Sequence, residues 1–132
     1  MQTKISLFKF GSDKSALKYD DLIVHISVNI ASKAELLRTL SIGLNFPEYF
    51  GENWDALEEC LRDLSWTNSK RIVIFHEGIP MIEPDQLQIY IQILLDCVEY
   101  WKLKNEHQLI VLFPPETKNA IGALILTLQD EE

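Results

Sequence analysis

Acidic and aromatic side chains are concentrated in one short part of this 132-residue sequence, from Phe46 to Trp66. The only base within it is Arg62, and its acids are Glu48, Glu52, Asp55, Glu58, Glu59 and Asp63. The local excess of five negative charges is most of the net charge of −8 that the whole chain carries at pH 7. Carboxylates gathered in this way attract a positively charged partner.

A helix is expected to carry most of these acids and to begin near Asn53, because an asparagine side chain can cap a first turn. At about 100° per residue, one side of this helix holds the apolar side chains of Trp54, Leu57, Leu61 and Leu64. The roughly opposite side holds Glu52, Asp55, Glu59, Asp63 and Trp66. The first side is expected to pack and the second to face outward, until Asn68 and Ser69 end the helix.

A row of acids is also typical of a solvated helix face, since the helix dipole favours acids near the N-terminus. The neighbouring aromatic residues favour the binding interpretation. Tyr49 and Phe50 come before the helix and Trp66 comes near its end. Aromatic anchors beside charge are common at protein interfaces, although such rings also occur in cores. In the same turn, Gly51 can take a backbone angle that other residues resist.

The turn and the helix start read Pro47-Glu48-Tyr49-Phe50-Gly51-Glu52-Asn53-Trp54-Asp55-Ala56-Leu57, and this run resembles the signature of the barstar family of small intracellular ribonuclease inhibitors. The family's succession of strands and helices can be followed over about residues 21–113. The resemblance therefore implies one barstar-like domain over residues 1–132, with an addition at each end. It also implies a protein that covers the cleft of a secreted microbial ribonuclease, with helix carboxylates where RNA phosphates would sit.

The family pattern is matched residue by residue at Tyr49, Gly51, Glu52, Asn53, Asp55, Ala56 and Leu57. Elsewhere the sequence departs from it: Glu59 stands where the best-known member has an aspartate that contacts the catalytic basic cluster. Phe50 replaces a tyrosine and Trp54 replaces a leucine. A late glutamate of the family corresponds to Glu99 or Glu106. The implied partner-binding residues are Tyr49, Phe50, Gly51, Asn53, Asp55, Glu59 and Trp66.

Two alternative functions use the same acidic face. An enzyme would take Asp55 or Glu59 as a general base together with His76, which is expected at a strand end. The sequence has no nucleophile motif, no glycine-rich phosphate loop and no His/Cys cluster, so no enzyme, cofactor or metal site is expected. The second alternative is a barstar-like immunity or regulatory module, which binds another basic protein without inhibiting a ribonuclease.

The composition narrows the kind of partner. A sequence pI of about 4.8 argues against direct binding to nucleic acid or to a membrane, and favours a basic protein such as a small ribonuclease or a nuclease toxin. No apolar run approaches the roughly 18 residues of a membrane span, and residues 1–10 alternate like a strand rather than a signal peptide. A cytoplasmic protein is therefore expected. Cys60 and Cys97 lack CxxC spacing, which predicts reduced, packed thiols.

Strands and helices are expected to alternate along the chain. Strands are predicted over residues 5–10, 22–28, 71–75 and 109–113. Helices are predicted after the capping box Ser32-Lys33-Ala34-Glu35 and from Pro84 to about Lys104. Residues 120–128 fit either a helix or an edge strand, and their bulky second half favours a strand. The sequence thus predicts a single α/β domain, with a mostly parallel sheet of three to four strands flanked by helices.

Overall fold

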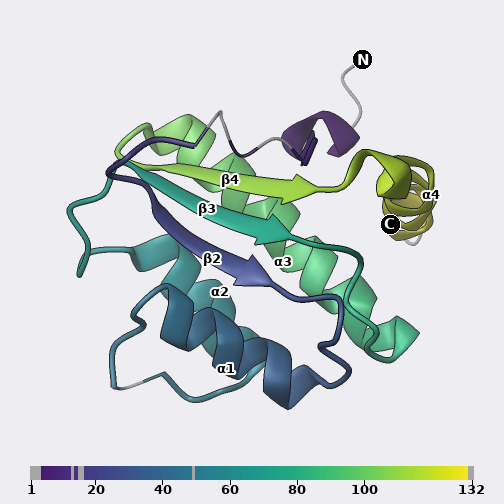
Figure 1. Cartoon of the computed structure of the whole chain (residues 1–132), viewed down its shortest axis with the longest axis horizontal. Coiled ribbons are helices and arrows are strands. Elements are labelled where there is room, and N and C mark those ends of the chain that lie inside the picture. The colour runs from purple at the N-terminus through teal and green to yellow at the C-terminus, as the bar shows by residue number, and fades with distance from the viewer. Residues whose placement is uncertain (1–3, 13, 15–16, 49, 131–132) are drawn as a thin grey trace.

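The computed structural model describes residues 4–12, 14, 17–48 and 50–130. Four strands form one sheet in the order β1-β4-β3-β2, and every neighbouring pair is parallel (Figure 1). The strands are β1 (Lys9–Phe10), β2 (Leu22–Ile26), β3 (Arg71–His76) and β4 (Gln108–Phe113). The prediction of a single α/β domain with a mostly parallel sheet is confirmed.

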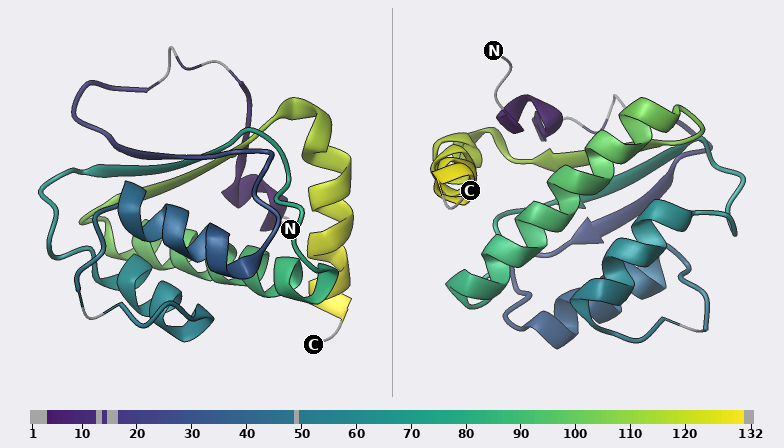
Figure 2. Two further views of the ribbon diagram at one scale, coloured as in Figure 1. Left: turned by 60° about the horizontal axis from the view of Figure 1, so that its bottom comes forward. Right: turned by 180° about the vertical axis from the view of Figure 1, so that it is seen from behind.

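Four α-helices accompany the sheet: α1 (Lys33–Gly43), α2 (Trp54–Asp63), α3 (Pro84–Lys104) and α4 (Lys118–Asp130). The short 3₁₀ helices η1 (Lys4–Leu7) and η3 (Pro115–Thr117) lie near the ends of the chain. Helices α1, α2 and α3 lie on one side of the sheet. Helix α4 follows the C-terminal end of β4 and lies beside η1 (Figure 2). On the other face, Leu17 packs against Val73, Phe75 and Ile110.

The two central strands are apolar on both faces, which is why they occupy the middle of a parallel sheet. Five of the six residues of β3, Ile72 to His76, are buried. Toward the helices, Ile74 and Val111 join a core that also contains Leu57 of α2 and Leu94 of α3. Removing this apolar surface from water is the main force that holds the helices to the sheet.

Local signals predict the main helices correctly. Ser32 caps α1 through a hydrogen bond from the backbone N–H of Glu35 at 3.1 Å, and α3 runs from Pro84 to Lys104 as expected. The predicted end of α2 is wrong, because the helix stops at Asp63 rather than near residues 68–69. Leu64 takes a left-handed backbone angle, with φ of 51°, and is fully buried, so the chain turns inward there.

Both ends of the chain differ from the predictions. Within the predicted strand at residues 5–10, only Lys9–Phe10 is a strand, and the preceding residues form η1. The predicted strand at residues 120–128 is wrong, because this segment belongs to helix α4. Ile121 and Ile125, one helical turn apart, are both buried, and a Cβ added at Gly122 would lie only 2.9 Å from the side chain of Ile5. The terminal segments thus pack against each other.

Cys60 and Cys97 are buried, and neither forms a disulfide, as the sequence predicted. Desolvation by burial is the largest cause that raises the pKa of Cys97, to about 12, so its thiol stays protonated at neutral pH. Within the part of the chain that the structure describes, no helix is both long and apolar enough to cross a membrane.

Candidate protein-binding site

The first turn of α2 is held by Asn53, as predicted. Its Oδ1 accepts a hydrogen bond from the backbone N–H of Ala56 at 2.8 Å, while its own backbone is extended. Gly51 does not take a positive φ in the structure, whereas the next residue, Glu52, does, with φ of 52°. Gly51 has a different local role: a Cβ there would lie 3.3 Å from Nδ2 of Asn53, so glycine leaves room beside the cap.

The two faces of α2 separate as the helical spacing predicts. The apolar stripe of Trp54, Leu57, Leu61 and Leu64 is buried. The acids of the other side, Glu52, Asp55, Glu59 and Asp63, are exposed. A hollow of about 340 Å³ lies on this exposed side and is lined by Asp55, Glu58, Glu59, Arg62 and Asp63. We call the surface formed by Asp55, Glu58, Glu59 and Asp63 the acidic face.

Two carboxylates of the acidic face have no cationic partner within the described chain. Among the residues that the structure describes, neither Asp55 nor Glu59 forms an ion pair. The base of this region, Arg62, places its guanidinium 5.4 Å from the centre of the Tyr100 ring on α3. The acids also affect a buried thiol of the same helix. The pKa of Cys60 is raised to about 11, mainly by desolvation and then by the negative charges of Asp63 and Glu59.

The aromatic residues next to the acidic face form a cluster around Phe46. The Phe46 ring lies 5.0 Å from that of Phe50 and 5.7 Å from that of Trp66, measured between centroids. Trp66 donates its Nε1–H to the carbonyl oxygen of Leu44 at 3.1 Å and is half-buried. The prediction that Trp66 lies on the acidic side of the helix is therefore wrong, because α2 ends before it. Tyr49 lies outside the described residues.

Trp54 anchors the start of α2 to the two neighbouring helices. Its Nε1–H donates to Oε1 of Gln86 on α3 at 2.7 Å, and Nζ of Lys33 on α1 lies 5.5 Å from the ring centre. The ring itself packs 6.0 Å from that of Tyr90 in the core. Because three contacts hold one large side chain, the first turn of α2 has a defined direction, and Asp55 is presented from a rigid element.

His76 is not available as the base of a catalytic site. It is buried, its Nδ1 donates to the carbonyl oxygen of Leu112 at 2.9 Å, and its Nε2 accepts from the hydroxyl of Tyr90 at 2.7 Å. Desolvation lowers its pKa to about 4, which keeps the imidazole neutral near pH 7. In the described part of the chain, no group of three or more His, Cys, Asp and Glu side chains is placed to hold a metal ion.

The structure adds Glu58 to the candidate site, a residue that the sequence counted among the acids of this region but not among the partner-binding residues. Glu58 lines the same hollow as Asp55 and Glu59. The helical spacing contains this signal, since Glu58 lies only about 60° around the helix from Asp55. Of the two late glutamates, Glu99 is exposed on α3 and Glu106 is exposed in the turn that leads to β4.

The structure is thus a small parallel α/β domain that presents an acidic helix face to the outside. A family model described as Barstar (barnase inhibitor) matches residues 22–113, and the chain belongs to this family. Barstar-family proteins are inhibitors rather than enzymes, and membership implies a barnase-type ribonuclease as the target. No curated protein matches the chain. The matched region contains β2, α1, α2, β3, α3 and β4, so η1, β1, η3 and α4 lie outside it.

Proposed function

We propose that this chain inhibits a barnase-type ribonuclease by covering its active site with α2 and the turn that precedes it. Asp55 and Glu59 support this proposal, because they are exposed on a capped helix without a cationic partner in the described chain. An RNA-cleaving site must attract phosphates, so it offers positive charge to which carboxylates can bind in place of the substrate.

The other proposed contact residues shape this surface in different ways. Asn53 holds the first turn and Gly51 leaves space beside the cap, so both set the direction of the carboxylates. Phe50, half-buried against Phe46, offers the exposed part of its ring to the partner. Trp66 also packs against Phe46, so it contributes to binding mainly by holding the turn in place. Tyr49 completes the proposed set, in line with the family resemblance.

The test is an RNA-cleavage assay with a barnase-type ribonuclease and increasing amounts of this chain. We expect inhibition that is complete near equimolar amounts. Asp55→Ala and Glu59→Ala should each weaken binding by about 2–5 kcal/mol, largely because a cation of the partner is then buried without its counter-charge. The denaturation midpoint should change little, since both side chains are exposed.

Glu116→Ala is the matched control, because this carboxylate is exposed on η3, outside the matched region. It should inhibit like the parent chain. If Asp55→Ala and Glu59→Ala also inhibit like the parent, the acidic face is not the contact surface. A chain that binds a basic nuclease without slowing RNA cleavage would instead support the immunity or regulatory module.

A further inference from the structure

The outer edge of β4 is only partly paired. Strand β1 covers it at two positions, Lys9 opposite Leu112 and Phe10 opposite Phe113. On its other edge, β4 pairs with β3 over five positions, from Gln108 to Leu112. Before Lys9 the chain leaves the sheet as η1. Among the described residues, the first half of β4 therefore has no strand beside it on the β1 side.

The direction of the backbone groups shows which ones face this open edge. The carbonyl oxygen of Phe113 accepts from Gly11 on the β1 side, whereas the N–H of Gln108 donates to Lys70 on the β3 side. Backbone groups alternate between the two sides of a strand. The N–H and C=O of Leu109 therefore point toward the open edge. Unpaired groups of this kind are a template for another strand.

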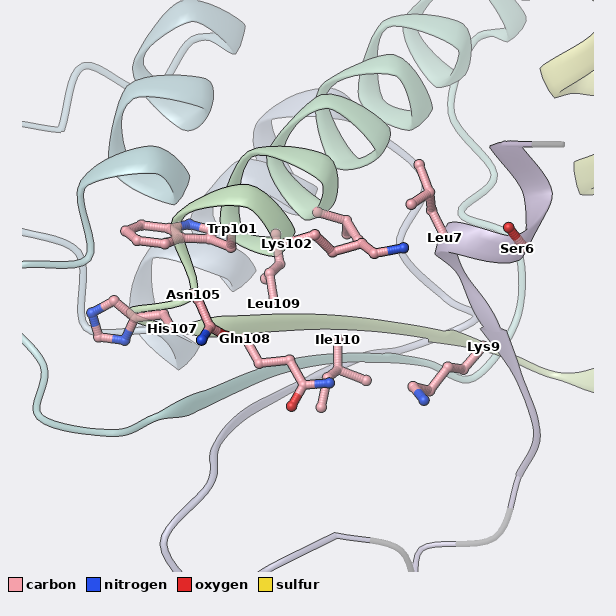
Figure 3. A pocket seen from close by; sticks show the side chains of 11 residues that line it. Ser6, Leu7, Lys9, Trp101, Lys102, Asn105, His107, Gln108, Leu109 and Ile110 are labelled. Atoms are coloured by element: carbon pink, nitrogen blue, oxygen red, sulfur yellow. The ribbon is translucent and has the colours of Figure 1, made fainter. Parts of the chain in front are cut away.

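A hollow of about 450 Å³ lies along this open edge (Figure 3). Its walls come from η1, β1, the end of α3 and the first half of β4, and include Leu7, Lys9, Val98, Lys102 and Ile110. The side chain of Lys102 reaches from α3 toward Leu7 (Figure 3). None of the described residues that line the hollow is acidic, although the chain as a whole has a net charge of −8.

The hollow and the acidic face lie on different sides of α3. Trp101 separates them: its Nε1–H donates to the carbonyl oxygen of Leu61 on α2 at 2.7 Å, while the residue also lines the hollow. Two lysines, apolar walls and unpaired backbone groups suit a different partner from the one that the acidic face attracts. An extended peptide with carboxylate side chains satisfies all three features.

We propose that this groove binds an extended acidic segment of another protein, which adds a short strand alongside the first half of β4. Main-chain hydrogen bonds to Leu109 hold the segment, its apolar side chains pack near Leu7 and Val98, and its carboxylates bind Lys9 and Lys102. Because the groove lies across α3 from the acidic face, this segment and a ribonuclease can be bound at the same time.

The probe is the acetylated and amidated hexapeptide Glu-Glu-Val-Val-Glu-Glu, titrated into ¹⁵N-labelled chain. Successive side chains of a strand point to opposite faces, so this peptide offers carboxylates both to Lys102 on the α3 side and to Lys9 on the other face of the sheet. We expect the peptide to slow hydrogen exchange at the amide of Leu109 and to shift its resonance, because a strand partner now accepts from this N–H. A peptide of the same length with lysine in place of glutamate should bind much more weakly. A third peptide, with N-methylated valines that cannot complete the ladder, should also lose binding.

Lys102→Glu should weaken binding of the acidic peptide by about fivefold or more, as expected when an exposed pairing charge is reversed. Lys18→Glu is the matched control, because this lysine is exposed outside the groove, and it should bind like the parent. Equal binding of the glutamate and lysine peptides would overturn the proposal. Failure of the acidic peptide to bind at millimolar concentration, or binding that leaves the Leu109 amide unprotected, would also overturn it.

Discussion

The neutral state of His76 follows from its two hydrogen bonds. A carbonyl oxygen only accepts, so Nδ1 carries the proton toward Leu112 and Nε2 is left to accept from Tyr90. The ring also stacks on Phe113, with 3.9 Å between the ring centroids. A second proton on the ring would displace the hydroxyl hydrogen of Tyr90 from Nε2 and place a charge in the core. This residue therefore stabilises the fold only while it is neutral.

The first prediction is acid destabilisation through His76. Burial lowers its pKa from 6.5 to about 4, so between these pH values the unfolded chain binds a proton that the folded chain excludes. The free energy of unfolding should fall by roughly 3 kcal/mol from this group as the pH drops through that window. Urea denaturation of the parent chain and His76→Leu at several pH values between 7 and 4 measures the difference.

The His76→Leu variant can be less stable at every pH, because Tyr90 loses its acceptor. The slope of stability against pH is the informative quantity, since carboxylates contribute equally to both chains. Parallel slopes for the two chains between pH 6.5 and 4 would show that His76 already binds a proton in the folded state.

At the scale of elements, α2 combines a structural side and a binding side in three helical turns. Its cap, its buried stripe and its contacts through Trp54 fix the helix, and the acids occupy what remains exposed. Stability and binding should therefore respond to different substitutions within the same helix.

Asn53→Ala should lower the free energy of unfolding by about 1 kcal/mol, because the N–H of Ala56 loses its acceptor. Asn53→Asp should retain most of the stability, since an aspartate oxygen caps the same N–H. Chemical denaturation of both variants checks this pair. Equal losses in the two variants would mean that the cap hydrogen bond is not what stabilises the turn.

Leu57→Ala should cost about 2–5 kcal/mol of stability, because the side chain is fully buried and its removal leaves a cavity. Tyr49→Ala, outside the described residues, should chiefly lower affinity for the ribonuclease. Denaturation read beside inhibitor titration separates the two effects. If Tyr49→Ala unfolds as readily as Leu57→Ala while its folded fraction inhibits normally, the turn serves packing rather than recognition.

For the whole molecule, the charge of −8 governs how partners approach. The acidic face concentrates part of this charge on one exposed helix side, whereas the groove beside β4 carries lysines. The segments that form η1, β1 and α4 lie outside the family match, and two of them, η1 and β1, build walls of that groove. The N-terminal addition thus contributes part of the wall of this groove, and the rest comes from residues 22–113.

The association rate with a basic ribonuclease should fall as ionic strength rises. Long-range attraction toward the acidic face is screened as the Debye length shortens, whereas short-range contacts in the complex change less. Stopped-flow measurement between about 0.05 and 0.5 M salt covers the range over which screening changes. A rate that stays constant across this range would exclude steering by the net charge.

Elements whose signals are local can be predicted from the sequence. Asn53 and Ser32 cap their helices through hydrogen bonds to the residue three positions later, and Pro84 starts α3. The apolar runs of β3 and β4 predict buried strands. The division of α2 into two faces follows from helical spacing alone. These features depend on neighbours in the chain, so they can be read without the fold.

Features that depend on residues far apart in the sequence are visible only in the folded chain. Residues 120–128 suit a strand locally, but no described strand lies beside them, and as a helix they bury Ile121 and Ile125. Helical spacing would place Trp66 on the acidic side of α2. The helix ends before it, at the inward turn of Leu64, and the Trp66 ring packs on Phe46 instead. In each case two local conformations are close in energy, and burial against residues far along the chain selects one of them.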